Sequence, residues 1–155
     1  MNTILDVDST IVDVGCTADQ TEVSNRRAID RTTEKFACFK SGTENPGIIV
    51  TPSHGLMSIV KKLRVYAHNN CPGCDAVSYV VEGRSDASAG WNIIGQGDLP
   101  WLPAHAGMNA RGLTVSSTYE SGDTNLVYTE VFFPSNGVPY LEYRLTFPQT
   151  RDPAR

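Results

Sequence analysis

Short runs that alternate apolar and polar residues recur along this chain, separated by glycine, proline, asparagine and aspartate. In the run 140–147, every second residue is apolar: Leu141, Tyr143, Leu145 and Phe147. The residues between them, Glu142, Arg144 and Thr146, are polar. A β-strand with one buried face requires this period of two, because successive side chains point to opposite faces. The pattern therefore predicts half-buried antiparallel strands.

Eight segments carry such a pattern: Thr10–Val14, Gly47–Thr51, Ser58–His68, Val77–Glu82, Trp91–Ile94, Gly112–Ser116, Leu126–Phe133 and Tyr140–Phe147. Lys61 interrupts the apolar face of the third segment, and only Val23–Asp30 hints at a helical turn. About eight short strands joined by turn-rich loops are typical of a β-sandwich or jelly roll. We predict an all-β fold, a two-sheet antiparallel β-sandwich forming one domain over residues 1–155.

The length of the chain bounds its core, and its net charge excludes some classes of binding partner. A chain of 155 residues buries roughly 70% of its unfolded surface, enough for one real core. The net charge of −4 argues against a general nucleic-acid or anionic-membrane surface, which needs a basic face. No segment reaches the ~20 apolar residues of a membrane helix. The start of the chain lacks the pattern of a signal peptide, so as written the chain is intracellular or its export signal was removed.

Three stretches, taken in order, resemble the galactose-binding-like (discoidin, or coagulation-factor type C) superfamily, in particular its bacterial members. Residues 28–36 read AIDRTTEKF, similar to the family's A-I-D-G-T-T-x-K-Y. Residues 47–53 read GIIVTPS and are followed by LRVYAHNN and SYVVEGRSD, and residues 143–147 read YRLTF. The resemblance covers roughly residues 10 to 152. It implies an eight-stranded jelly roll that serves as a non-catalytic recognition module, with carbohydrate, lipid head groups or proteins as ligands and with the site in loops at one end.

The resemblance also implies a structural calcium ion. Asp30 matches the family's calcium-binding aspartate, and Thr33 is a neighbouring ligand candidate. Calcium prefers carboxylate and carbonyl oxygens. Arg31 stands where the family has glycine and places a cation beside the site. The alternative is that Asp30 caps a turn through its own backbone.

Aromatic rings and polar loop residues are the candidates for sugar binding. A flat ring covers the apolar face of a pyranose, while polar side chains bind the hydroxyls. Trp101 lies between prolines in a loop, where it is either a stacking platform or packed on the domain edge. Trp91 lies in an apolar run and is expected in the core. The candidate polar partners all lie in loops: His54, His68, Asn69, Asn70 and His105.

The four cysteines are Cys16, Cys38, Cys71 and Cys74. The pair C-P-G-C at 71–74 matches a redox motif, but such chemistry usually needs a following helix, and here a strand pattern follows. A zinc site would need a second such pair, which the sequence lacks. A local disulfide or two free thiols are the favoured alternatives.

We therefore expect a recognition module, not an enzyme, with carbohydrate as the first ligand class. A protein-interaction or structural module is the second hypothesis, and an enzyme that uses the cysteine pair or a metal is the third. Relatives continue beyond the Y-R-L-T-F strand to one more strand that covers the first. This chain has no such pattern after Pro148. Either the charges of Asp6, Asp8 and Asp13 shield the uncovered strand at 10–14, or two copies pair through it into a symmetric dimer. We favour pairing, because the apolar residues near this strand leave much surface to cover.

Overall fold

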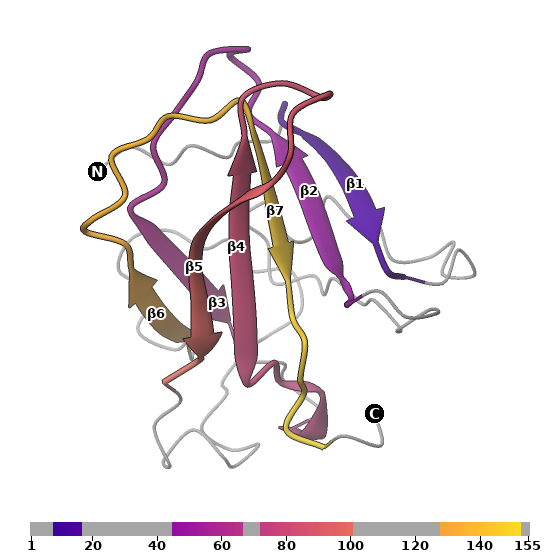
Figure 1. The fold of residues 1–155 in the computed structure, drawn as a ribbon. Coiled ribbons are helices and arrows are strands. Elements are labelled where there is room, and N and C mark those ends of the chain that lie inside the picture. Colours follow the sequence, from indigo (N-terminus) through magenta and orange to yellow (C-terminus); the bar gives the residue numbers. More distant parts are fainter. Residues whose placement is uncertain (1–7, 17–44, 67–71, 101–127, 153–155) are drawn as a thin grey trace.

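The structure is a computed structural model, and it describes residues 8–16, 45–66, 72–100 and 128–152. Within these residues the chain forms seven strands and one short 3-10 helix (Figure 1). The elements, in chain order, are β1 (Thr10–Val14), β2 (Gly47–Thr51), β3 (Lys62–Tyr66), η2 (Pro72–Cys74), β4 (Ser78–Arg84), β5 (Asn92–Asp98), β6 (Tyr128–Phe132) and β7 (Glu142–Thr146). No helix in this part of the chain is long and apolar enough to cross a membrane.

The strands form two antiparallel sheets. One has five strands in the order β1-β2-β7-β4-β5, and the other pairs β3 with β6. The predicted all-β, two-sheet antiparallel fold is therefore confirmed. The predicted strand at Gly112–Ser116 and the helical hint at Val23–Asp30 lie outside the described residues.

Most strand boundaries lie within two residues of the predicted ones, with two exceptions. β5 continues to Asp98, four residues beyond the predicted end at Ile94, and β3 begins late. β1 and β2 have the predicted bounds, and β2 ends where Pro52 removes a backbone donor. β3 begins only at Lys62, so Lys61 precedes the strand. Ser58, at the start of the predicted segment, instead forms a separate bridge with Tyr140. This late start explains why Lys61 breaks the apolar alternation.

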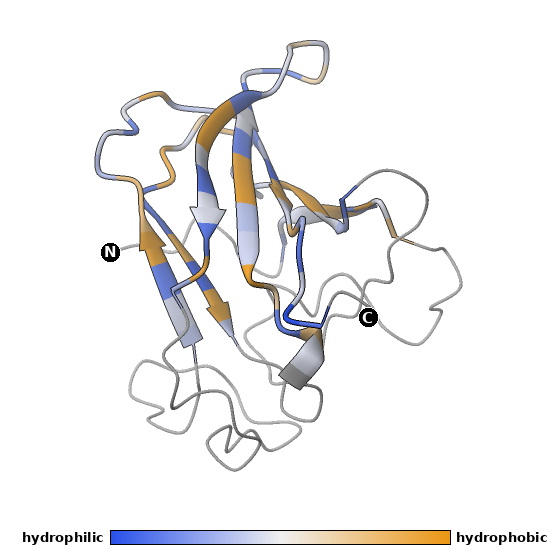
Figure 2. Ribbon diagram, turned by 60° about the horizontal axis from the view of Figure 1, so that its bottom comes forward, coloured by the Kyte–Doolittle hydropathy of each residue, from blue (hydrophilic) through white to orange (hydrophobic). Residues whose placement is uncertain are grey.

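The core lies between the inner faces of the two sheets. Its buried centre consists of Tyr79, Val81, Leu99 and Phe133. Leu63, Val65 and Val131 from the two-stranded sheet and Leu145 from β7 pack against it. Hydrophobic and hydrophilic bands alternate along the strands (Figure 2), as the period of two requires.

A glycine allows one of the close contacts in this core. A Cβ atom at Gly95 would lie 2.5 Å from the ring of Phe133. The missing side chain lets this ring approach β5, where it also packs 6.1 Å from the ring of Tyr79. We therefore attribute Gly95 to packing, not to turn formation.

The register sets which side chains share each outer face. In the five-stranded sheet, Glu82 pairs with Arg144, and Arg84 pairs with Glu142. In the two-stranded sheet, the outward pairs are Lys62 with Phe132, Arg64 with Glu130, and Tyr66 with Tyr128. Thr146 lies in the same outward row as Arg144, as the alternation predicts, but its side chain is buried.

Candidate functional site

His54 is the one predicted ligand-binding residue that the structure describes. It is exposed in the loop between β2 and β3, and its Nδ1 atom lies 3.3 Å from the hydroxyl of Ser53. The other predicted binding residues, Trp101, His105, His68, Asn69 and Asn70, lie outside the described residues. The same is true of the predicted calcium ligands, Asp30 and Thr33.

The strand directions place His54 at one end of the sandwich and the ends of β3 and β5 at the other. β2 ends at Thr51, which lies at the same end as Thr10 and Glu142. β5 ends at Asp98 opposite Ser78, at the other end of the sheet, and β3 also ends there (Figure 1). The segments with residues 68–70 and 101–105 follow those two strand ends in the sequence. We conclude that His54 belongs to the opposite end of the sandwich from the ends of β3 and β5.

Around His54, two loops are held together by hydrogen bonds. The backbones of Ser58 and Tyr140 exchange hydrogen bonds of 2.9 and 2.8 Å. Asn136 donates its side-chain amide to the carbonyl of Val60 at 2.8 Å, and the ammonium of Lys61 donates to the carbonyls of Pro134 and Asn136. Four large apolar side chains are exposed on these two hydrogen-bonded loops: Leu56, Met57, Ile59 and Val138.

Trp91 begins a polar cluster on the outer face of the five-stranded sheet. Arg84 and Arg144 place their guanidinium carbons 4.4 and 4.8 Å from the centroid of the indole ring. Trp91 is half-buried and belongs to no core cluster, so the prediction that it packs in the core is wrong. It immediately precedes β5, whose first residue, Asn92, pairs with Gly83, the neighbour of Arg84. We call Trp91, Arg84, Arg144, Glu82 and Glu142 the Trp91 cluster.

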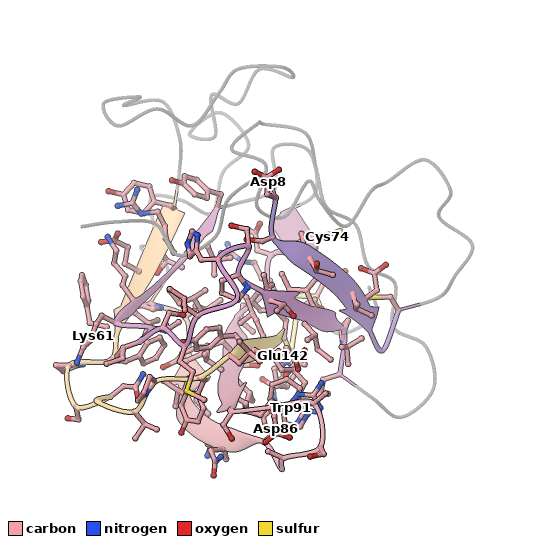
Figure 3. All side chains as sticks on the ribbon, turned by 90° about the horizontal axis from the view of Figure 1, so that it is seen from above. Asp8, Lys61, Cys74, Asp86, Trp91 and Glu142 are labelled. Carbon is pink, nitrogen blue, oxygen red and sulfur yellow. The ribbon has the colours of Figure 1, made fainter. Side chains whose placement is uncertain are left out.

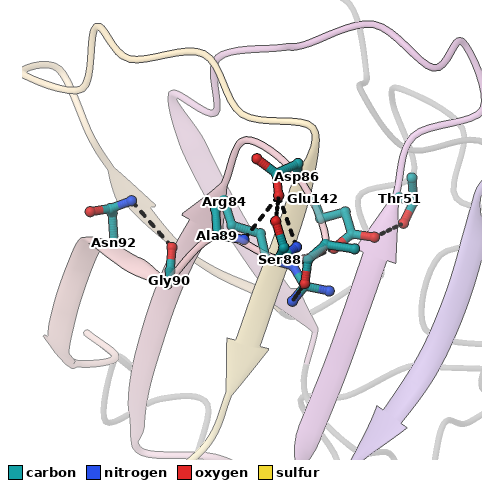
Figure 4. Close-up of polar contacts among 9 residues, drawn as sticks. Thr51, Arg84, Asp86, Ser88, Ala89, Gly90, Asn92 and Glu142 are labelled. Carbon is teal, nitrogen blue, oxygen red and sulfur yellow. Dashed lines mark hydrogen bonds and ion pairs between the residues drawn. The ribbon is translucent and has the colours of Figure 1, made fainter.

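Each arginine of the Trp91 cluster has its own carboxylate. Arg84 is bonded to Glu142, and Arg144 donates to Glu82 at 2.6 Å. Glu142 also accepts a hydrogen bond of 3.3 Å from Thr51, which extends the cluster to β2 (Figure 4). Seen from above, Trp91 and Glu142 lie together on one side of the molecule, away from Lys61 (Figure 3). The charges of this cluster balance, and its contacts join β2, β7, β4 and the start of β5.

A second arginine-aromatic surface covers the outer side of the two-stranded sheet. We call it the β3–β6 face, and its members are Lys62, Arg64, Tyr66, Tyr128, Glu130 and Phe132. The guanidinium of Arg64 lies 4.3 Å from the ring centroid of Tyr128, whose ring lies 5.6 Å from that of Tyr66. Tyr128 is 40% exposed and Phe132 is 59% exposed. This face therefore presents aromatic rings to solvent beside fixed polar groups.

Glu130 organises the charges of the β3–β6 face. Its Oε1 atom accepts hydrogen bonds from Lys62 at 2.8 Å and from Arg64 Nε at 2.7 Å. The hydrogen bond from Lys62, followed by that from Arg64, lowers the pKa of the Glu130 carboxyl below its ordinary value. Arg64 also donates to the hydroxyl of Tyr66 at 3.2 Å. One carboxylate thus serves two cations here, in contrast to the Trp91 cluster.

Sequence reasoning assigned no role to the β3–β6 face, although a signal was present. Residues 62–66 read K-L-R-V-Y and residues 128–132 read Y-T-E-V-F. In both segments, charged or aromatic residues occupy every second position. Because that period places them on one side of a strand, two such segments indicate a polar aromatic surface wherever they pair.

The cysteines that the structure describes have a structural role. Cys16 and Cys74 are both disulfide-bonded, and no described cysteine is free. The free-thiol alternative is therefore wrong for Cys74. The described residues also contain no group of three or more metal-ligating side chains.

Comparisons of the sequence give no assignment, because no family model and no curated protein matches it. Comparison with solved structures, in contrast, finds proteins of similar fold. The chain is similar to the family 32 carbohydrate-binding module (CBM) from Clostridium perfringens NanJ in complex with galactose, at 10% identity and a TM-score of 0.55. That match covers 92% of this chain and 84% of the other. It is also similar to CBM32-3 from a family 31 glycoside hydrolase of C. perfringens, at 12% identity and a TM-score of 0.61, over 94% and 82% of the two chains.

A third match is to the CBM32-1 and CBM32-2 domains of C. perfringens ZmpB in complex with GalNAc, with 12% identity and a TM-score of 0.56. It covers 91% of this chain and 30% of that longer one. These likenesses establish that the chain has the fold of family 32 carbohydrate-binding modules, the galactose-binding-like fold that its sequence resembles.

Proposed function

We propose that this protein is a non-catalytic carbohydrate-binding module. The observation that supports this proposal is the likeness to three modules of family 32 over at least 91% of the chain. Two of them are in complex with galactose or GalNAc. Because a fold alone does not determine function, the proposal depends on a binding experiment.

We further propose that the ligand lies among the loops that follow β3 and β5, with Trp101 as the stacking platform. His105, His68, Asn69 and Asn70 are the polar partners in this proposal. An indole ring covers the apolar face of a sugar, and imidazole and amide groups bind its hydroxyls. His54 is not included, because it belongs to the opposite end of the sandwich.

A glycan array followed by calorimetry tests the proposal. With a galactose- or GalNAc-containing ligand, Trp101→Ala should weaken binding by ~1–3 kcal/mol, as expected for the loss of a stacked aromatic contact. Trp91→Ala is the matched control, because this tryptophan lies under two arginines on a sheet face. Unchanged affinity in a folded Trp101→Ala protein would place the site elsewhere. An array with no retained glycan would refute the carbohydrate function itself.

Four exposed apolar side chains on two neighbouring loops, Leu56, Met57, Ile59 and Val138, support a second function, docking onto another protein. Exposed apolar residues can mark interaction sites, and hydrogen bonds join the two loops that carry these four. If these residues dock a partner, Leu56→Ser should abolish a complex that Trp101→Ala leaves intact. The reverse pattern would assign that complex to the glycan site.

The disulfides indicate where such a module acts. Cys16 and Cys74 are disulfide-bonded, and disulfides persist in oxidising compartments, not in the reducing cytosol. We propose that the protein works outside the cytosol. A protein whose cysteines all titrate as free thiols when isolated from its cell would contradict this.

Two further proposals concern calcium and self-association. We propose that Asp30 and Thr33 help to bind calcium, in which case a chelator lowers the melting temperature and Asp30→Ala removes that effect. We also propose pairing of two copies near β1, where Val12 is 55% exposed. Light scattering that finds a monomer at every concentration would reject this pairing.

A further inference from the structure

The β3–β6 face combines exposed aromatic rings with an excess of positive charge. Among its six members, Lys62 and Arg64 are cations and Glu130 is the single carboxylate. The chain as a whole carries a net charge of −4, so this face is locally opposite in sign. We infer that it is a second binding site, which takes an acidic oligosaccharide laid along β3 and β6. This inference rests on the proposed carbohydrate function.

The charged groups keep donors and an acceptor available for a ligand. Lys62 and Arg64 both direct their bonds to Oε1 of Glu130, and no hydrogen bond to its Oε2 atom is formed within the described residues. An ammonium has three donors, and one of those on Lys62 meets Glu130. A sugar hydroxyl can donate to Oε2 while it accepts from Lys62. The net positive charge favours sugars that also carry a carboxylate.

The spacing of the rings indicates an oligosaccharide and not a single sugar. Tyr128 and Phe132 lie on the same face of β6 and are separated by four positions. At about 3.3 Å per residue, their α-carbons are roughly 13 Å apart. That distance exceeds the width of one sugar ring, so both rings can be covered only by a chain of linked sugars. At the Tyr66 end of the face, the chain continues into His68, Asn69 and Asn70, which belong to the proposed loop site.

The side chains of this face are already held in position. Arg64 is fixed on two sides, by the carboxylate of Glu130 and by the hydroxyl of Tyr66, and it lies against the ring of Tyr128. Lys62 is held by Glu130 and lies 5.9 Å from the ring centroid of Phe132. A surface ordered before binding loses less conformational entropy when the ligand arrives.

The experiment uses a glycan array with uronate- and sialate-bearing oligosaccharides, their methyl esters and their neutral counterparts. We expect the protein to retain acidic oligosaccharides, and we expect methyl esterification or added salt to weaken their binding. Tyr128→Ala combined with Phe132→Ala should lower their affinity about tenfold, the scale of lost aromatic contacts. Ile93→Ala is the matched control, because Ile93 is also 59% exposed but belongs to the other sheet.

Lys62→Gln and Lys61→Gln separate the charge of this face from charge in general. Lys61 is the sequence neighbour, yet it donates to loop carbonyls and not to Glu130. Only Lys62→Gln should reduce binding of the acidic ligands.

Three results would overturn the inference. If acidic oligosaccharides bind the Tyr128/Phe132 double variant as tightly as the wild type, the β3–β6 face is not their binding site, although the protein still binds carbohydrate. Neutral counterparts that bind this face equally well would remove the preference for acidic sugars. A wild-type protein that retains no glycan would refute this inference and the proposed function together.

Discussion

The two outer faces of the sandwich use the same side-chain chemistry to opposite effect. In the Trp91 cluster, two arginines lie against one indole ring, and each has its own carboxylate. On the β3–β6 face, an arginine and a lysine share one carboxylate, and the rings beside them remain open to solvent. Within the part of the chain that the structure describes, each cation of the first arrangement has its own carboxylate, whereas the second has two cations for one carboxylate beside exposed aromatic rings.

The difference teaches how to distinguish a structural network from a binding surface. Cation–π and ion-pair contacts occur in both faces, so their presence alone identifies neither. What differs is the number of carboxylates available to each cation. The Trp91 cluster connects three neighbouring strands and Trp91 through balanced pairs, as a stabilising network should. The β3–β6 face connects only two strands and has one more cation than it has carboxylates.

The largest expected effect that tests this comparison is on stability. Trp91→Ala removes a half-buried ring and two cation–π contacts, so we expect a loss of about 2–3 kcal/mol in the free energy of unfolding. Tyr128→Ala removes a more exposed ring with one cation–π contact, and we expect about 1 kcal/mol. Denaturant titration measures both. Equal losses, or a larger loss for Tyr128→Ala, would contradict the assignment of the two faces.

A smaller effect is expected at the carboxylates. Glu142→Ala leaves Arg84 without its carboxylate and also removes the bond from Thr51, which should cost about 1–2 kcal/mol. In that pair the side chains are 19% and 17% exposed. Glu130→Ala should cost less, about 0.5 kcal/mol, because removing it also frees two partly exposed cations to be solvated. A greater loss of stability for Glu130→Ala, measured by the same titration, would show that the β3–β6 face is the structural network.

The strand pattern predicted the fold well because its information is local. Alternation along residues 140–147 identified Tyr143 and Leu145 as inward, as the structure has them. It also placed Glu142 and Arg144 on the outer side. Each of these statements depends only on the period of two within one strand.

The candidate surfaces could not be predicted in the same way, because they depend on which strands are neighbours. Glu82 and Arg144 are 62 positions apart, and Lys62 and Glu130 are 68 apart. Alternation says that each residue faces outward, but it does not say what lies opposite. Trp91 illustrates the failure. Its apolar neighbours suggested the core, whereas the pairing of β5 with β4 brings the ring beneath Arg84.

The smallest expected effect concerns the shared carboxylate itself. The hydrogen bonds from Lys62 and Arg64 lower the pKa of Glu130. A carboxyl whose pKa is lower in the folded state stabilises the fold above its unfolded pKa. That contribution is lost as the pH falls through the lowered value. Because Glu130 and its partners are partly exposed, solvent screens the effect, and we expect a few tenths of a kcal/mol.

Carboxyl chemical shifts, followed by NMR as the pH is lowered, measure the titration of Glu130 directly. Lys62→Gln removes the largest cause of the shift, so the pKa of Glu130 should rise toward its ordinary value. Lys61→Gln should leave it unchanged, because the ammonium of Lys61 is bonded to the carbonyls of Pro134 and Asn136. If both variants move the pKa equally, the shift reflects general charge near the sheet. The shared carboxylate would then not distinguish the two faces, and their contrast would depend on the exposure of the rings alone.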